Sequence, residues 1–353
     1  MNNTANAILK ELNIEAMLVT SIENVRYFTG FMGDSSYLLF TKDEQFFITD
    51  FRYMEAAKDQ LGQEYQFICT NTNNRAQKIG DILFKNSVKN LGIEYKNMTL
   101  NRYYDFDKIF DVWEYVDISE SLSKARSTKT PEEIERMRQG AKINELAFSR
   151  LLSVIKPGMT EYDIKAELLY QFYKHGADSA FDPIIASGPN GSYPHAVVSD
   201  RKIQPGDLIT MDFGCKYQGY CTDITRTIGV GNIDKTAQTI YNIVMTAQGN
   251  SLAAVKAGAE AAAVDKIARE YIQSQKYGEY FDHGVGHGVG VEIHEAPRVA
   301  PQSQDILEEN MVITIEPGIY IPGKLGVRIE DMVLVTQDGV ENFYELPKDL
   351  IIL

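Results

Sequence analysis

Three of the five histidines lie in one short stretch, "FDHGVGHGVGVEIHEAP", at residues 281–297. Glycines fall at every second position from 284 to 290, so neither a dinucleotide loop nor a phosphate loop fits, and a helix is disfavoured. We therefore expect an extended or looped backbone that packs closely against another segment. Alternation would put His283 and His287 on one face and His294 on the other, unless a β-bulge intervenes.

Four carboxylates stand at the ends of strands that their apolar neighbours predict to be buried, and these are Asp212, Asp223, Glu316 and Glu330. The two aspartates would face the same side of a hairpin whose turn lies around residues 218–219. On the later strand, Arg328 would share a face with Glu330, whereas Asp331 would point the other way. Each residue taken singly fits an ordinary turn or strand end, but the set together favours a metal site.

A buried anion needs a cation or a metal as its partner, and few basic residues lie near these carboxylates in the sequence. Oxygen-rich ligands with at least one histidine favour a hard or borderline divalent ion, and two carboxylate-bridged ions fit better than one. Manganese is the first expectation, with cobalt or zinc as substitutes. Two ions about 3.5–4 Å apart would share a water, make it hydroxide and polarise a carbonyl, so the predicted chemistry is hydrolysis.

The elements that precede residue 122 predict a small α/β domain. Its predicted helices are 51–61 and 75–86, and its predicted strands are 15–20, 36–40, 45–50, 65–70 and 90–95. We place this domain at residues 1–122, a polar linker at 123–130 and a second domain at 131–353.

The second domain contains two similar halves. A helix begins at Pro131, with Thr130 as its cap and Glu133 reaching back to that cap. The pattern of residues 151–176 is repeated in residues 251–278. In each stretch one predicted helix ends at a Lys-x-Gly corner and a second helix follows. Strand-rich sequence follows both. The pattern predicts an α+β domain of duplicated helix–helix–strand units with a site at their pseudo-symmetric centre.

Composition limits the class of protein. The 353 residues carry a net charge of −14, which disfavours nucleic acid and anionic membrane as partners. No apolar run reaches the length of a membrane span, and the first residues lack the layout of a signal peptide. Cys69, Cys215 and Cys221 are too few for a disulfide framework, and His175 is expected to end a helix. We expect a cytoplasmic protein.

Over nearly its whole length the chain resembles the proline-specific pita-bread metallopeptidases, aminopeptidase P and Xaa-Pro dipeptidase. The later part matches through "FDPIIASGPNGSYPHAVVSD", "MDFGCKYQGYCTDITRT", "HGVGHGVGVEIHE" and "ITIEPGIYIPGKLGVRIED". The first part, through "NVRYFTGFMGDSSYLLFTKDEQFFITDFRYMEAA", is similar to the family's creatinase-like domain. The ordered set Asp, Asp, His, Glu, Glu carries the resemblance.

The resemblance implies two metal ions held by five residues, which are Asp212, Asp223, His287, Glu316 and Glu330. Asp223 and Glu330 would each bind both ions. Glu316 would also accept the proton of the attacking hydroxide and pass it to the leaving proline nitrogen.

Other residues match positions that surround the metals in the family. Three histidines would hold the substrate carbonyl and stabilise the tetrahedral intermediate, and these are His195, His283 and His294. Arg328 and Tyr320 match supporting residues, and Arg328 would bond to a ligand carboxylate such as Asp212. The stretch "SYPHA" departs from the usual Leu-Pro-His-Gly, so Tyr193 and Ala196 would line the approach to the pocket.

The implied activity is release of the residue before proline from peptides with proline second, as an Xaa-Pro aminopeptidase. An Xaa-Pro dipeptidase acting on dipeptides stays open as an alternative. The full ligand set argues against a metal-free creatine amidinohydrolase and against a binding protein that has lost catalysis, and methionine aminopeptidase does not usually carry the first domain. The resemblance also leaves a homodimer open.

Overall fold

The computed structural model describes residues 2–353, and the chain divides into two compact units between Arg126 and Ser127. This division falls four residues after residue 122, where the sequence placed the end of the first domain. The segment 123–130, predicted as a linker, is largely helical, because helix α6 (Ser119–Ser127) covers its first part. Leu122 on this helix is buried in the core of the first unit, a contact that the polar composition of the segment conceals.

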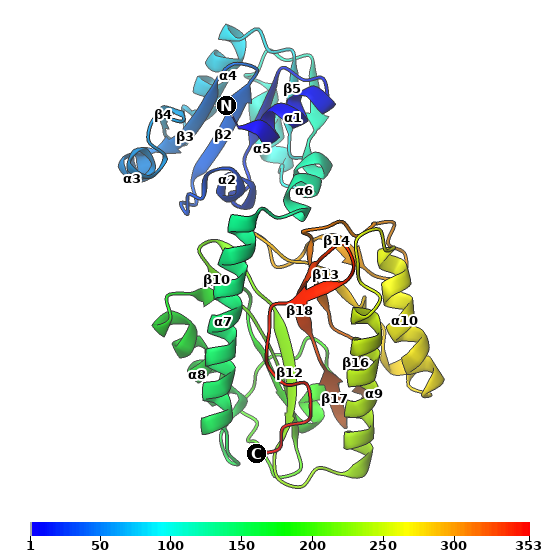
Figure 1. The fold of residues 1–353 in the computed structure, drawn as a ribbon. Helices are drawn as coiled ribbons and strands as arrows, with labels where there is room; N and C mark the ends of the chain where they lie inside the picture. Colours follow the sequence, from blue (N-terminus) through cyan, green and yellow to red (C-terminus); the bar gives the residue numbers. More distant parts are fainter. Residues whose placement is uncertain (1) are drawn as a thin grey trace. The chain divides into compact units, whose positions relative to one another are not determined.

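The first unit is an α/β domain built on a six-stranded sheet of order β4-β3-β2-β1-β5-β6 (Figure 1). Its strands are β1 (Ala16–Val19), β2 (Ser36–Thr41), β3 (Gln45–Asp50), β4 (Gln66–Thr70), β5 (Asn90–Ile93) and β6 (Glu114–Asp117). Its other helices are α1 (Asn3–Glu11), α2 (Ile22–Thr29), α3 (Phe51–Leu61), α4 (Arg75–Lys85) and α5 (Leu100–Asp107). All five predicted strands and both predicted helices are present, whereas α1, α2, α5 and β6 were not predicted.

Burial on both faces of this sheet explains its continuous apolar strands. Met17 and Val19 of β1 pack into a cluster with α1, α2, α3 and α6, and the alternate residues Ala16 and Leu18 pack into a second cluster with α4 and α5. Helices therefore cover both sides of the sheet.

The second unit has the duplicated arrangement that the sequence predicts. Its helices are α7 (Pro131–Val154), α8 (Glu161–Lys174), α9 (Lys235–Leu252) and α10 (Ala261–Ser274). The capping box of Thr130 and Glu133 begins α7, and His175 caps the end of α8. Both Lys-x-Gly corners turn at a glycine with positive φ, +91° at Gly158 and +83° at Gly258, a conformation that glycine adopts without steric cost.

The strands of the second unit form several small antiparallel sheets. The strands of the first half are β7 (Asp178–Ser179), β8 (Ile184–Ser187), β9 (Leu208–Phe213), β10 (Cys215–Tyr217), β11 (Tyr220–Cys221) and β12 (Ile224–Gly229). Those of the second half are β13 (Gly286–Gly288), β14 (Glu295–Val299), β15 (Val312–Ile315), β16 (Gly318–Ile321), β17 (Leu325–Arg328), β18 (Asp331–Val335) and β19 (Val340–Asn342). An isolated bridge pairs Thr225 with Glu330, so strands of the two halves meet at this point.

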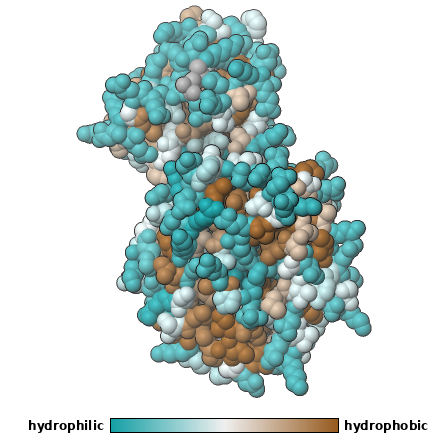
Figure 2. Space-filling view, viewed as in Figure 1, coloured by the Kyte–Doolittle hydropathy of each residue, from teal (hydrophilic) through white to brown (hydrophobic). Residues whose placement is uncertain are grey.

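The surface is mostly hydrophilic on the face that Figure 2 shows. Hydrophobic residues gather on the second unit near the end that carries the C-terminus in Figure 1. Among residues 2–353, no helix combines the length and the apolar character needed to cross a bilayer.

Candidate metal centre

The first half of the second unit contributes two aspartates from neighbouring strands. Asp212 lies on β9 directly opposite Thr225 of β12, and Asp223 immediately precedes β12. The hairpin between them turns at Gln218 and Gly219, both with positive φ, as the sequence predicts. Asp223 is buried and Asp212 is partly buried.

The second half contributes one histidine and two glutamates from three strands. His287 lies on β13, Glu316 follows β15 and Glu330 precedes β18. The glycine pattern around His287 is explained by close backbone contact, because a Cβ on Gly286 would lie 1.9 Å from the carbonyl oxygen of Thr314, and one on Gly288 would lie 2.1 Å from that of Ala296. The tight packing expected of this stretch is therefore present.

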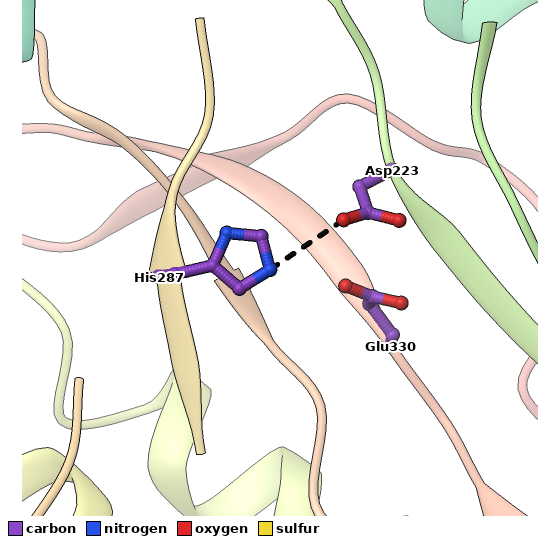
Figure 3. A group of neighbouring side chains, drawn as sticks. All are labelled: Asp223, His287 and Glu330. Atoms are coloured by element: carbon purple, nitrogen blue, oxygen red, sulfur yellow. Dashed lines mark ion pairs between the residues drawn. The ribbon is translucent and has the colours of Figure 1, made fainter. Parts of the chain in front are cut away.

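The side chains of the two halves converge on one point. Figure 3 shows His287 pointing toward the carboxylates of Asp223 and Glu330, which come from different strands. One ligand atom from each of these three residues lies within 4.8 Å of the others. The Nε2 atom of His287 is 3.5 Å from Asp223 Oδ2 and 3.3 Å from Glu316 Oε1.

Hydrogen bonding orients the His287 ring for metal binding. Its Nδ1 lies 3.0 Å from the carbonyl oxygen of Gly288, which only accepts, so Nδ1 carries the proton. Burial acts to lower the pKa of His287, but the hydrogen bond and charge of Glu316 outweigh this effect and raise it. A metal that displaces the Nε2 proton would meet the Nε2 lone pair beside the carboxylates. This is the arrangement in which proteins usually hold a metal-ligating histidine.

The buried carboxylates call for a cation. Burial raises the pKa of Asp223 well above its ordinary value, and the charges of Glu330, Asp212 and Glu316 raise it further. Burial likewise raises the pKa of Glu330, with contributions from Glu316 and Asp212. Asp223 Oδ1 and Glu330 Oε1 are buried and have no hydrogen-bond partner among residues 2–353. Two buried carboxylate oxygens without donors, beside an imidazole, fit a divalent metal.

The other two carboxylates have partners that offset their burial. Burial acts to raise the pKa of Glu316, but its hydrogen bond with His287 and the charge of that ring outweigh this effect and lower it. Burial raises the pKa of Asp212, opposed by Arg328, whose Nη2 donates to Asp212 Oδ2 at 2.6 Å. Asp331, as predicted, points away from this cluster and pairs with Arg226 at 2.8 Å.

His283, Tyr320 and Arg328 form a chain of hydrogen bonds beside the carboxylates. Arg328 Nη1 donates to the Tyr320 hydroxyl at 2.7 Å, and that hydroxyl lies 3.0 Å from His283 Nε2. His283 Nδ1 lies 2.8 Å from the carbonyl oxygen of Gly284, so both ring nitrogens are engaged. Burial lowers the pKa of His283 and raises that of Tyr320 to about 12, which keeps the ring neutral and the phenol protonated at neutral pH.

His294 and His195 are both exposed. A register shift after His287 lets the chain return so that the rings of His287 and His294 lie 4.3 Å apart. A β-bulge therefore interrupts the simple alternation of residues between the two faces of the strand. Burial lowers the pKa of His294, and the charges of His287 and His195 lower it further against the opposing charge of Glu316. Tyr193, two residues before His195, is 63% exposed.

Threonines outside the predicted set of site residues support the cluster. Thr225 Oγ1 donates to Glu330 Oε2 at 2.6 Å, and Thr314 Oγ1 accepts from the backbone nitrogen of His287 at 3.1 Å. Tyr344 donates to the carbonyl oxygen of Asp223 at 2.7 Å. For Thr314 the sequence signal is a polar residue inside the apolar stretch "VITIE".

Comparison with protein families gives two matches. Residues 135–337 match the model of metallopeptidase family M24, and residues 3–128 match that of the creatinase/prolidase N-terminal domain.

Individual proteins are similar along nearly the whole chain. An uncharacterized peptidase of Bacillus subtilis is 43% identical, and the Xaa-Pro dipeptidase of Pyrococcus furiosus is 37% identical, each over 97% of both chains. Among solved structures, the Xaa-Pro dipeptidase from Bacillus anthracis is 40% identical with a TM-score of 0.95, covering 99% of this chain and 98% of that one. The X-Pro aminopeptidase from Thermotoga maritima is 34% identical with a TM-score of 0.91, covering 98% and 100%.

Proposed function

This chain belongs to metallopeptidase family M24, and we propose on that basis that it is a metal-dependent exopeptidase that cleaves the peptide bond before proline. The observation that carries the proposal is the cluster of His287 with Asp223, Glu330 and Glu316, in which Asp223 and Glu330 each present an oxygen without a hydrogen-bond donor among residues 2–353. Its pita-bread fold with a creatinase-like first domain is that of the Xaa-Pro peptidases it resembles.

We propose that the site holds two divalent metal ions, with manganese as the first choice. Asp212, Asp223, His287, Glu316 and Glu330 would hold them, and Asp223 and Glu330 would bind both. When bound, the ions supply polarisation of the scissile carbonyl and activation of water. The assignment rests on the donor set, because one imidazole with four carboxylates suits a hard or borderline ion.

We assign the transfer of the proton during the reaction to Glu316. Its Oε1 lies 3.3 Å from His287 Nε2 at the inner edge of the cluster, and Glu316 is only partly buried, so the carboxylate also has access to the substrate side. It would take a proton from the attacking water and deliver it to the proline nitrogen as that nitrogen leaves.

The side chains around the cluster bind and orient the substrate. His195 and His294 are exposed and free to contact the substrate carbonyl, and Tyr193 lines the approach. His283 would act through its hydrogen bond with Tyr320, because both of its ring nitrogens are engaged. Arg328 holds Asp212 and Tyr320 in place.

Substrate length separates two candidates. The sequence favours an aminopeptidase that acts on longer peptides, and the Thermotoga maritima relative is called an X-Pro aminopeptidase. The relatives from Bacillus anthracis and Pyrococcus furiosus, which are more similar to this chain, are called Xaa-Pro dipeptidases. We therefore propose Xaa-Pro dipeptides as the preferred substrates and longer peptides with proline second as the alternative. A cytoplasmic location and a homodimer complete the proposal.

The test is hydrolysis of Leu-Pro, Arg-Pro-Pro and the control dipeptide Leu-Ala by chelated protein with and without added manganese. Cleavage of Leu-Pro that depends on manganese supports the dipeptidase, and cleavage of Arg-Pro-Pro alone supports the aminopeptidase. Preference for Leu-Ala would contradict proline specificity. No cleavage by protein with measured bound metal would contradict the enzymatic function.

A further inference from the structure

A fully buried carboxylate in helix α8 binds both ends of the loop that carries His195. Glu161, the first residue of α8, has no exposed surface. Its Oε1 accepts from the backbone nitrogen and the hydroxyl of Ser187, both at 2.7 Å. Its Oε2 accepts from the backbone nitrogen of Ser199 at 3.0 Å and from the Ser199 hydroxyl at 2.7 Å. One carboxylate oxygen therefore serves each end of the loop.

The interior of this loop has a further contact with the same side chain. Asn190 Nδ2 lies 3.1 Å from Glu161 Oε1 and 3.2 Å from Oε2. A buried carboxylate is stable only where donors replace its lost hydration, and here backbone, hydroxyl and amide donors do so. The position of Glu161 at the start of α8 adds the favourable field of the helix N-terminus.

The residues between the two attachment points are those that face the substrate side. Tyr193 is 63% exposed, Val197 is 84% exposed and His195 is exposed between them. Val198, at the end of the exposed run, is buried. The loop thus has fixed ends and an exposed middle. Two contacts to other segments lie between the ends, because the Pro194 carbonyl oxygen accepts from Arg328 Nη1 and Ser192 Oγ accepts from the backbone nitrogen of Gly323, both at 3.3 Å.

An ion pair between Arg201 and Asp207 supports the same attachment. Arg201 Nη1 donates to the Ser187 hydroxyl at 2.7 Å, and the guanidinium contacts both oxygens of Asp207, at 2.6 and 2.8 Å. The Ser187 hydroxyl therefore donates to Glu161 while it accepts from Arg201. This relay fixes the rotamer of Ser187 and with it the start of the loop.

The second half holds its own histidine loop in a corresponding way. Asp265 of α10 has no exposed surface, accepts from the backbone nitrogen of Val285 at 3.0 Å and pairs with Arg269 at 2.8 and 2.9 Å. Arg269 in turn donates to the carbonyl oxygens of His283, at 2.7 Å, and Phe281, at 3.2 Å. In each half, the second helix of the pair uses a buried acid to hold the segment that presents a histidine.

We propose that Glu161 is a positioning residue that holds the Ser187–Ser199 loop so that Tyr193 and His195 meet the substrate. This inference rests on the proposed function. Within residues 2–353, the hydrogen bonds of Glu161 go to Ser187, Asn190 and Ser199, which lie outside the proposed ligand set. Glu161 therefore acts on substrate binding and turnover and not on metal retention.

The test compares Glu161→Gln with Glu167→Gln. The substitution at 161 keeps the volume but converts one acceptor into an amide donor, so one end of the loop faces a donor in place of an acceptor. Glu167 lies on the same helix, and its main partner is the exposed Arg150 at 3.0 Å, so the same change there is the control. The measurements are kcat and KM for the Xaa-Pro substrate, bound metal, melting temperature and hydrogen exchange of residues 188–198.

We expect Glu161→Gln to lower kcat/KM about 10- to 100-fold with its metal retained, the range typical of residues that orient a site. Exchange of the loop amides should become faster, while Glu167→Gln behaves like the parent protein. Ser199→Ala, which removes one hydroxyl donor, should have a smaller effect in the same direction and serves if Glu161→Gln does not fold. Unchanged kcat/KM with unchanged exchange, or activity fully restored by excess manganese, would overturn the proposal.

Failure of the proposed function has a different signature. In that case the parent protein would not cleave Xaa-Pro substrates, but faster loop exchange in Glu161→Gln than in Glu167→Gln would still show that Glu161 holds the loop.

Discussion

The imidazole rings of His287 and His294 lie with their centroids 4.3 Å apart and their planes at 73° to each other. The two rings nevertheless have different surroundings. His287 directs Nε2 at Asp223 and Glu316, whereas His294 is exposed. In the function we propose, these neighbouring imidazoles would have separate tasks, one toward the metal and one toward the substrate.

We expect His287→Ala to lose bound metal and activity together, and His294→Ala to keep its metal while losing most of kcat. The reason is that the Nε2 of His287 faces the carboxylate cluster. Metal analysis after dialysis and steady-state kinetics measure the two effects, with His175→Ala at the end of α8 as control. A His294→Ala protein that loses metal but regains full activity on reconstitution would contradict the assignment.

Arg328→Lys is expected to weaken metal binding by about 10- to 100-fold, since supporting residues of metal ligands have effects of this size. Lysine keeps the charge but cannot contact Asp212 Oδ2 and the Tyr320 hydroxyl with a planar fork. Titration of chelated protein with manganese gives the affinity. Arg138→Lys, on an exposed pair with Glu341, is the matched control, and an equal loss there would refute the explanation.

Asp223→Asn should stabilise the chelated protein, and increasingly so as the pH rises. The raised folded pKa of Asp223 means that the folded state binds more protons than the unfolded state above about pH 4, where an unfolded aspartate titrates. Stability attributable to this group therefore falls as pH rises toward the folded pKa.

The measurement is the difference in melting temperature between Asp223→Asn and the parent protein from pH 5 to pH 8, with chelator and with manganese. The difference cancels contributions from other groups. We expect it to grow with pH in chelator and to reverse in sign with manganese, which stabilises only a protein that binds it. A difference independent of pH would show that Asp223 is ionised in the metal-free protein.

One thiol should react rapidly in the native protein and three after unfolding. Cys69 is exposed, while Cys215 and Cys221 are buried. Burial raises the pKa of Cys215 to about 12, so its thiolate is scarce at pH 8. Counting thiols with a coloured disulfide reagent at pH 8 tests this, and Cys69→Ser should abolish the fast phase. Two or more fast thiols in the native protein would contradict the burial of the other pair.

Local signals predicted much of the fold. The capping box at Thr130 begins α7, and glycine corners begin α8 and α10, because these features depend on residues a few positions apart. The polar composition of the segment 123–130 predicts a linker, whereas tertiary contacts of helix α6, such as those of Leu122 and Arg126, depend on residues far along the chain.

The sequence could predict the kind of site, but not all of the contacts that support it. Strand-end carboxylates and the glycine-rich histidine stretch indicated a metal from residue chemistry alone. The roles of Glu161 and Asp265 depend on loops far along the chain, and a helical Glu or Asp has no sequence feature that marks it as buried. The proximity of His294 to His287 could not be predicted either. It depends on a register shift between strands that the alternation of residues does not encode.

The two halves of the second unit supply different donors to one cluster, aspartates from the first and a histidine with two glutamates from the second. The halves are therefore alike in architecture but not interchangeable in content. Two copies of the first half would bring only carboxylate oxygens, and two copies of the second would double the imidazoles. Each such symmetric protein, ancestral or designed, would select a different metal. In the proposed metal centre, divergence of the halves, more than their duplication, would thus set the chemistry.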